Sequence, residues 1–162
     1  MELRFYQLKM STLEQALSKL LMLTIKRDKR AIVRFASEQR LAAFDDFLWT
    51  FDDQAFLPHG QLGQETDSMQ PVLLTTETKI APNKPDFIFW VDCFNPIVTH
   101  LDPFSTEHAE RVSIIFSGQD EGQLSLARYF FRQAIDQTKY KSSYWQEDSH
   151  GVWVEVPTKQ AQ

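Results

Sequence analysis

Cysteine is almost absent from this sequence, and glycine and proline are scarce. Cys93 is the one cysteine among 162 residues, so no disulfide can form within the chain. Such usage is expected of a reducing compartment, and with no base beside it in sequence Cys93 is predicted to be a small buried hydrophobic residue. Five glycines and seven prolines are too few for a low-complexity chain.

Long apolar runs are also missing. Runs such as 20–23 are far shorter than the roughly 20 residues that a membrane-spanning helix needs. The first nine residues alternate polar and apolar side chains and include Arg4, unlike the apolar core of a secretory signal. We therefore expect a cytoplasmic protein.

A basic excess is the third absence, since the formal net charge is −5. Proteins that bind nucleic acid directly gain much of their affinity by neutralising phosphates with lysine and arginine. Direct DNA binding is therefore disfavoured, and contact with nucleic acid is expected to be local or indirect. An acidic surface does not exclude a basic pocket for an acidic peptide.

Apolar and aromatic residues, by contrast, are plentiful. Hydrophobic residues make up 43% of the chain and aromatic residues 13%, which is enough for one domain with its own core. We assign residues 1–157 to a single α/β domain and the polar residues 158–162 to a flexible tail.

Hydrophobic periodicity predicts strands and helices in alternation. Strands are expected at 5–8, 31–36, 72–75, 86–91 and 112–116, with 152–156 as an edge strand or a surface segment. Helices are expected from a capping box at Ser11–Glu14 to Lys29, from Ser37 to Phe51, near 106–110, and from 122 to 140. This order favours an α/β fold, a mostly parallel sheet flanked by helices in a Rossmann-like three-layer arrangement.

The residues that nucleotide or metal chemistry requires are not in suitable places. A phosphate-binding loop needs glycine after the first strand, and that turn reads Lys9-Met-Ser-Thr. The histidines are too scattered for a metal site, and no serine stands in a nucleophile elbow. We predict no phosphate-binding loop, catalytic residue, cofactor or metal. The alternative is a nucleotide- or small-molecule-binding enzyme on a Rossmann-like scaffold.

An aromatic cluster follows the second predicted helix. It comprises Trp49, Phe56, Leu57, Pro58 and His59. One interpretation is a satellite core folded under the loop. The other is an exposed apolar anchor for a protein partner, because tryptophan and aromatic side chains dominate binding hot spots.

Cationic residues form a column on the last predicted helix. At 100° per residue, the buried stripe consists of Leu124, Ala127, Phe131, Ala134 and Ile135. Arg128, Arg132 and Lys139 follow the edge of this stripe over about 16 Å.

Two interpretations of this column stay open. It is a solvated flank whose arginine stems cover apolar surface, or a groove for an acidic peptide, because arginine binds carboxylates bidentately. Lys141, Tyr144 and Trp145 follow shortly and are able to close such a groove. A C-terminal carboxylate is a natural ligand for this combination.

The order and spacing of several pieces resemble the chi subunit of bacterial DNA polymerase III over about residues 3–145. The pieces are Phe5-Tyr-Gln-Leu, the helix–strand pair up to Phe35, Asp46-Phe-Leu-Trp, Ala55-Phe-Leu-Pro-His, and Leu126-Ala-Arg followed by Arg132. The tryptophan followed seven residues later by Phe-x-Pro-His is the most telling of them.

This resemblance implies a non-catalytic accessory subunit of DNA replication on a nucleotide-binding-like fold without nucleotide chemistry. It implies two partners: the psi subunit or an equivalent, which tethers chi to the clamp loader, and the acidic C-terminal tail of single-stranded DNA-binding protein, which ends in a phenylalanine carboxylate. The chain is then expected to be a monomer alone and a heterodimer with its partner, meeting nucleic acid indirectly.

The resemblance also implies roles for individual residues. The psi-type contact is expected at Trp49, Phe56 and Pro58, with Leu57 and His59 beside them. The tail-binding pocket is expected at Arg128, Phe131 and Arg132, with Phe116 as an apolar wall, Lys139 in the same column and Trp145 as a looser match. One departure is Leu124, which stands where a lysine is expected one turn before Arg128.

Overall fold

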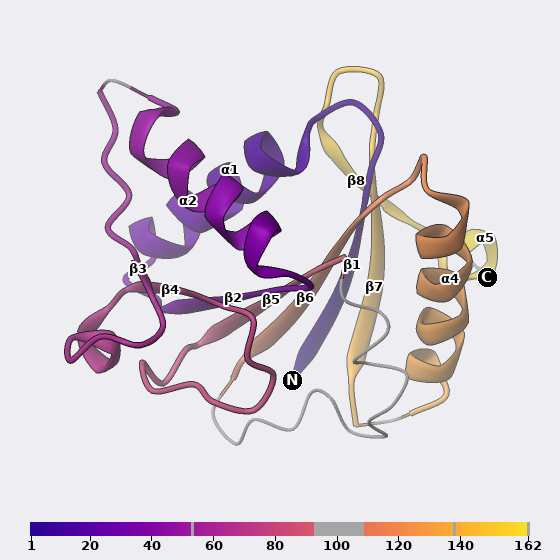
Figure 1. The fold of residues 1–162 in the computed structure, drawn as a ribbon. Helices are drawn as coiled ribbons and strands as arrows, with labels where there is room; N and C mark the ends of the chain where they lie inside the picture. The colour runs from indigo at the N-terminus through magenta and orange to yellow at the C-terminus, as the bar shows by residue number, and fades with distance from the viewer. Residues whose placement is uncertain (53, 93–108, 138, 162) are drawn as a thin grey trace.

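The computed structural model describes residues 1–52, 54–92, 109–137 and 139–161 (Figure 1). Cys93, two of the histidines and most of the helix predicted near 106–110 lie outside the described residues. Within them, no helix is both long enough and apolar enough to cross a membrane.

The described strands form one sheet in the order β3-β4-β2-β5-β6-β1-β7-β8. The strands are β1 Glu2–Leu8, β2 Ala31–Phe35, β3 Gly60–Gln61, β4 Val72–Thr75, β5 Phe87–Val91, β6 Arg111–Ser117, β7 Lys141–Glu147 and β8 Trp153–Val156. All neighbours are parallel except β7 and β8, which are antiparallel. The sheet is therefore mostly parallel, as predicted.

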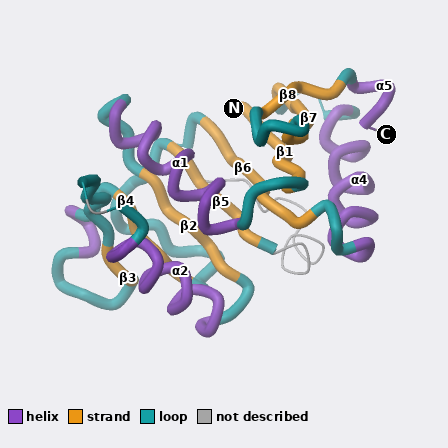
Figure 2. The backbone as a smooth tube through the Cα atoms, turned by 90° about the horizontal axis from the view of Figure 1, so that it is seen from above, coloured by secondary structure: helices purple, strands orange, loops and turns teal. Residues whose placement is uncertain are grey.

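Helices cover both faces of this sheet (Figure 2). They are α1 Leu13–Lys26, α2 Glu38–Thr50, the 3-10 turn η1 Asp67–Met69, α4 Glu121–Ile135 and the single turn α5 Thr158–Ala161. The alternation along β1 makes two cores: Leu3 and Phe5 pack toward α4, whereas Tyr6 and Leu8 pack toward α1 and α2. The predicted three-layer arrangement is confirmed.

The chain reverses its direction of travel across the sheet between β1 and β6. From β1 it passes through α1 to β2, on the far side of β6 and β5, whereas from β6 it passes through α4 to β7, on the far side of β1. In open α/β sheets, ligands bind at the carboxyl ends of the strands that flank such a switch point.

The first helix begins one residue later than the sequence pattern indicates. Thr12 is the N-cap and forms the capping box with Gln15, in place of the predicted Ser11 and Glu14. Glu14 instead pairs with Arg40 of α2 at 2.9 Å. The helix ends at Lys26, and Asp28 takes a left-handed conformation with φ 56°.

The main error of the prediction lies after α4. The helix was expected to reach residue 140, but it ends at Ile135 with Asp136 as its C-cap. A carboxylate is unfavourable there, because the C-terminal end of a helix carries a partial negative charge. The chain then forms β7, which the sequence analysis did not predict as a strand. β7 lies against β1. Of the two alternatives for 152–156, the edge strand is the one observed, as β8.

Candidate functional site

The two predicted contact surfaces lie on different layers of the molecule. One is at the C-terminal end of α2, on the face covered by α1 and α2, and the other is on α4, across the sheet (Figure 1). Nothing in the described fold makes one surface block the other.

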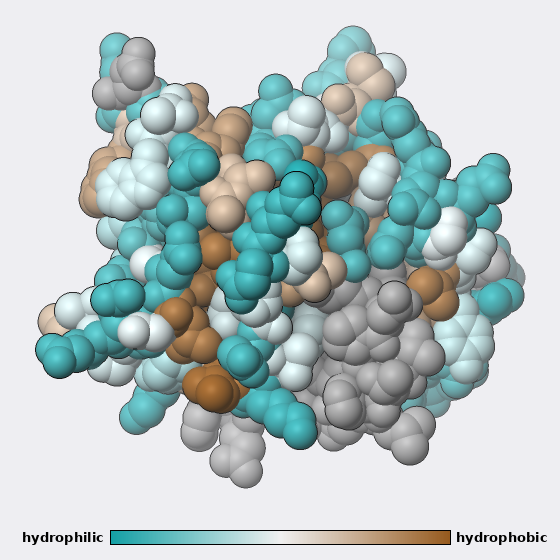
Figure 3. Space-filling view, in the orientation of Figure 1, coloured by the Kyte–Doolittle hydropathy of each residue, from teal (hydrophilic) through white to brown (hydrophobic). Residues whose placement is uncertain are grey.

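The first surface, here called the α2 patch, comprises Trp49, Phe56, Leu57, Pro58 and His59. Trp49 and Phe56 are 59% and 66% exposed, and their ring centroids lie 6.1 Å apart. Leu57 is completely buried and belongs to the core, and Pro58 is half-buried. Apolar and aromatic side chains gather over this end of α2, at the upper left of the space-filling view (Figure 3). The patch is thus a pair of exposed rings on a buried support.

His59 is the centre of that support. Its imidazole is buried under Trp49, with 4.8 Å between the ring centroids. Nδ1 lies 2.7 Å from the carbonyl oxygen of Leu57, and Nε2 lies 3.0 Å from a carboxylate oxygen of Asp45. Because both nitrogens are held, the ring is a fixed platform for Trp49 rather than a contact residue itself.

The second surface lies on α4 and begins with the predicted stripe. Ala127, Phe131 and Ala134 are buried, and Leu124 and Ile135 are half-buried against the same core, as predicted. Arg128 and Arg132 are exposed one turn apart at the edge of the stripe. Among the described residues, neither arginine has a carboxylate partner.

Arg128 lies close to Tyr144 of β7. Burial raises the pKa of Tyr144 to about 12, although the nearby positive charge of Arg128 opposes this. The neutral hydroxyl donates to the Gln7 side-chain oxygen at 2.7 Å, and Gln146 donates to the same oxygen at 3.0 Å. Arg128 therefore lies close to the end of a polar network that joins β1 and β7.

Two aromatic residues that were predicted to line the tail-binding pocket, Phe131 and Phe116, are buried in the core. Phe131 is 1% exposed and Phe116 is 0% exposed. Their ring centroids lie 5.3 Å and 6.1 Å from that of Tyr144. In this conformation neither ring offers a contact surface, because both are packed into the core that supports the Tyr144 ring.

Trp145 does not join the two arginines as expected, and Lys139 lies outside the helix that carries them. Lys139 lies in the turn after α4, and its Nζ is 5.3 Å from the centroid of the Tyr140 ring. Trp145 points to the other face of the sheet, because neighbouring strand residues alternate. It stacks on Tyr6 at 6.4 Å, with the Arg4 guanidinium 5.5 Å from its ring. The sheet therefore separates Trp145 from Arg128.

One exposed apolar residue on the same side of the sheet as α4 is Val154. Val154 pairs with Gln146, and Val156 pairs with Tyr144, so both valines point to the face that α4 covers. Val156 packs against that core, whereas Val154 is 48% exposed. We call Arg128, Arg132 and Val154 the α4 surface. Val154 could not be found from the sequence alone, because its place depends on the pairing of β7 with β8.

These surfaces can be set beside known protein families. The family model described as DNA polymerase III chi subunit, HolC, matches residues 1–139. The chain belongs to this chi family. The match includes the whole α2 patch and both arginines of α4, and it ends before β7 and β8.

Membership in the chi family makes the chain an accessory subunit of the DNA polymerase III replication machinery. A comparison with curated proteins finds no match. Within the described residues, no cluster of three or more histidine, cysteine or acidic side chains is arranged to hold a metal ion.

Proposed function

We propose that this chi-family chain links the clamp loader to single-stranded DNA-binding protein by holding the acidic C-terminal tail of that protein on the α4 surface. The observation that carries the proposal is the position of Arg128, which is exposed on α4, close to Tyr144, and without a carboxylate partner among the described residues. Such a guanidinium is available to an incoming carboxylate.

The chemistry of the α4 surface suits an acidic tail that ends in an aromatic residue. Arg128 and Arg132 are four residues apart, so they follow one another along the helix by about 6 Å. Arginine forms bidentate, charge-assisted hydrogen bonds with carboxylates. Val154, exposed on the same side, offers apolar contact for a terminal phenylalanine ring.

A titration with a labelled acidic peptide ending in Ile-Pro-Phe tests this proposal. We expect micromolar binding that weakens as salt rises, since exposed charges are screened. Arg128→Ala should weaken binding by about 1.5–3 kcal/mol, or about 10- to 150-fold, the range for a hydrogen bond to a charged group.

Arg27→Ala is the matched control, because it removes the same charge from an exposed residue at the end of α1. It should leave the peptide affinity unchanged within about twofold. Equal affinities for the wild type and the Arg128→Ala variant would refute the assignment of this site.

The α2 patch supports the second contact, with psi or an equivalent clamp-loader partner. Trp49 and Phe56 present two large exposed rings on the fixed platform of His59. Aromatic anchors of this kind contribute most of the energy of protein interfaces and lose little entropy when their support is rigid. The two surfaces together would make the chain a bridge between two proteins.

A further inference from the structure

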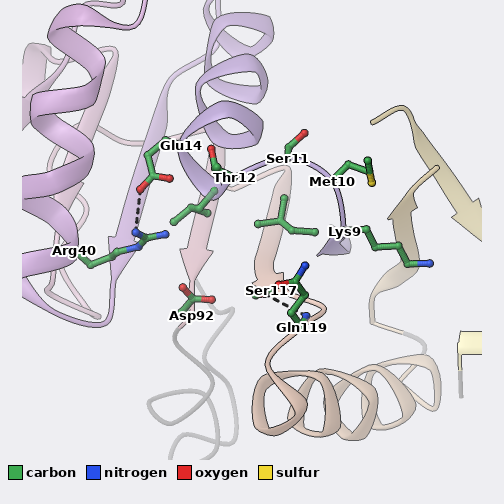
Figure 4. Close-up of a pocket in the computed structure, with 11 residues that line it drawn as sticks. Lys9, Met10, Ser11, Thr12, Glu14, Arg40, Asp92, Ser117 and Gln119 are labelled. Carbon is green, nitrogen blue, oxygen red and sulfur yellow. Dashed lines mark hydrogen bonds and ion pairs between the residues drawn. The ribbon is translucent and has the colours of Figure 1, made fainter. Parts of the chain in front are cut away.

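The carboxyl ends of β1 and β6 border a cavity of about 430 Å³ at the switch point of the sheet (Figure 4). Its wall includes the turn after β1, the Glu14–Arg40 ion pair and Asp92. In nucleotide-binding folds of this topology, phosphate binds to backbone N–H groups of the turn after the first strand. Here that turn contains no glycine, and its N–H groups are already engaged.

Three successive backbone N–H groups converge on one oxygen of Glu147. The amides of Lys9, Met10 and Ser11 donate to Glu147 Oε2 at 3.1, 2.7 and 2.9 Å. Consecutive N–H groups aimed at one point form an anion-binding nest. Glu147 is 3% exposed, and no cationic side chain among the described residues pairs with it. Backbone dipoles hold this charge.

Strand pairing explains how Glu147 reaches the nest. Gln146 lies opposite Gln7 in the parallel β1–β7 pair, so the next residue stands level with the end of β1. Burial disfavours the charged carboxylate, but the hydrogen bonds from the turn outweigh it and lower the pKa of Glu147. The group is therefore an anion at neutral pH, and it lies beyond the part of the chain that the chi family model matches.

We infer that the turn Lys9–Ser11 is an oxyanion site whose ligand is the chain's own Glu147. The carboxylate is bound by N–H groups of the turn after the first strand, as a phosphate is in nucleotide-binding folds. It fastens β7 and β8 to the start of α1, and it leaves these three N–H groups unavailable to a phosphate. Removal of this carboxylate should leave a site for a small oxyanion such as sulfate, phosphate or acetate.

Chemical rescue of Glu147→Ala tests the inference, with thermal unfolding measured in sodium sulfate and in sodium chloride at equal ionic strength. The variant should unfold at a lower temperature than the wild type in chloride. Sulfate should raise its melting temperature with a saturable dependence on concentration, because a ligand that binds the folded state stabilises it. The wild type should show no saturable response, since its site is filled.

Glu155→Ala is the charge-matched control, because Glu155 is an exposed carboxylate on β8. It should behave as the wild type does. The inference is overturned if Glu147→Ala melts at the wild-type temperature, or if sulfate raises all three melting temperatures alike.

A second measurement uses the wild type alone, so that the inference can be tested even if Glu147→Ala does not fold. In the wild type, the amide proton shifts of Lys9, Met10 and Ser11 should titrate together, with one shared midpoint below the ordinary glutamate pKa of 4.5. Independent titrations, or none, would overturn the inference without any substitution.

Discussion

At the scale of single residues, Tyr144 on β7 links the hydrophobic core to polar groups at the surface of α4. Tyr144 contacts the rings of Phe5, Phe116 and Phe131, and its hydroxyl donates to Gln7 with the charge of Arg128 nearby. The same residue is thus part of the hydrophobic core and a polar neighbour of an exposed cation. A small change at its hydroxyl should affect binding through Arg128.

Tyr144→Phe removes that hydroxyl and keeps the ring. We expect the affinity for the acidic peptide to fall several-fold, because Arg128 loses the polar hydroxyl beside it. The free energy of unfolding should fall by about 1 kcal/mol, because the hydrogen bond to Gln7 is lost. Peptide titration and urea unfolding measure the two effects. Tyr129→Phe, on an exposed ring of α4, is the control. Unchanged peptide affinity in Tyr144→Phe would show that Arg128 is positioned by other contacts.

Glu147 gives a prediction about pH. Because its folded-state pKa is lowered, its ionised form stabilises the protein at pH values above its ordinary pKa, and this stability is lost as pH falls through the folded value. The difference in unfolding free energy between wild type and Glu147→Gln should be full at pH 7 and shrink below about pH 4.5. A difference that is constant between pH 7 and pH 3 would contradict the role of the charge.

At the scale of elements, periodic segments could be predicted from the sequence and β7 could not. The strands β4, β5 and β6 and the stripe of α4 follow from apolar spacing alone. β7 carries Tyr144 and Trp145 side by side among polar residues, so it lacks the alternation of a half-buried strand. Its buried glutamate is compensated by amides 136 to 138 residues away in sequence, which no local pattern reveals.

The same limit applies to the candidate site. Arg128 and Arg132 could be placed at the edge of the α4 stripe because helical spacing fixes them. The exposure of Trp49 and the burial of Phe116 could not be decided, because aromatic residues serve cores and surfaces equally well. The face on which Trp145 lies was not predicted, because it depends on the pairing of β7 with β1.

A substitution at Leu124 would measure how much the charge of α4 contributes to the affinity for the acidic tail. Leu124 lies one turn before Arg128 and is half-buried against the core. Leu124→Lys should raise peptide affinity several-fold through an added charge, and burial lost from the leucine should lower the unfolding free energy by about 1–2 kcal/mol. Ser125→Lys is the control, because it adds the same charge at an exposed neighbouring position. If Leu124→Lys raises the peptide affinity no more than Ser125→Lys does, the proposal that the peptide lies along the Arg128 edge of α4 is contradicted.

At the scale of the whole molecule, the sheet keeps the two surfaces apart. The α2 patch and the α4 surface lie on opposite layers, and residues without shared contacts usually act additively. The chain should therefore bind both partners at once, as a bridge must.

Trp49→Ala and Arg128→Ala should then separate the two contacts. We expect Trp49→Ala to lose co-purification with clamp-loader subunits while its peptide affinity stays within about twofold of the wild type. Arg128→Ala should show the reverse pattern. Mass spectrometry of the purified complexes and peptide titration provide the measurements. Loss of both contacts in either variant would mean that the surfaces are coupled or that the fold is damaged.

The two ends of the sheet have a consequence for self-association. β3 has only two residues, and β8 has four, with Glu155 within it and Pro157 directly after it. Short edges that carry charge and proline resist pairing with the backbone of another copy. Concentrated protein should thus stay in solution as separate copies rather than stack into continuous sheets, which leaves each copy's outer surfaces free for unlike neighbours.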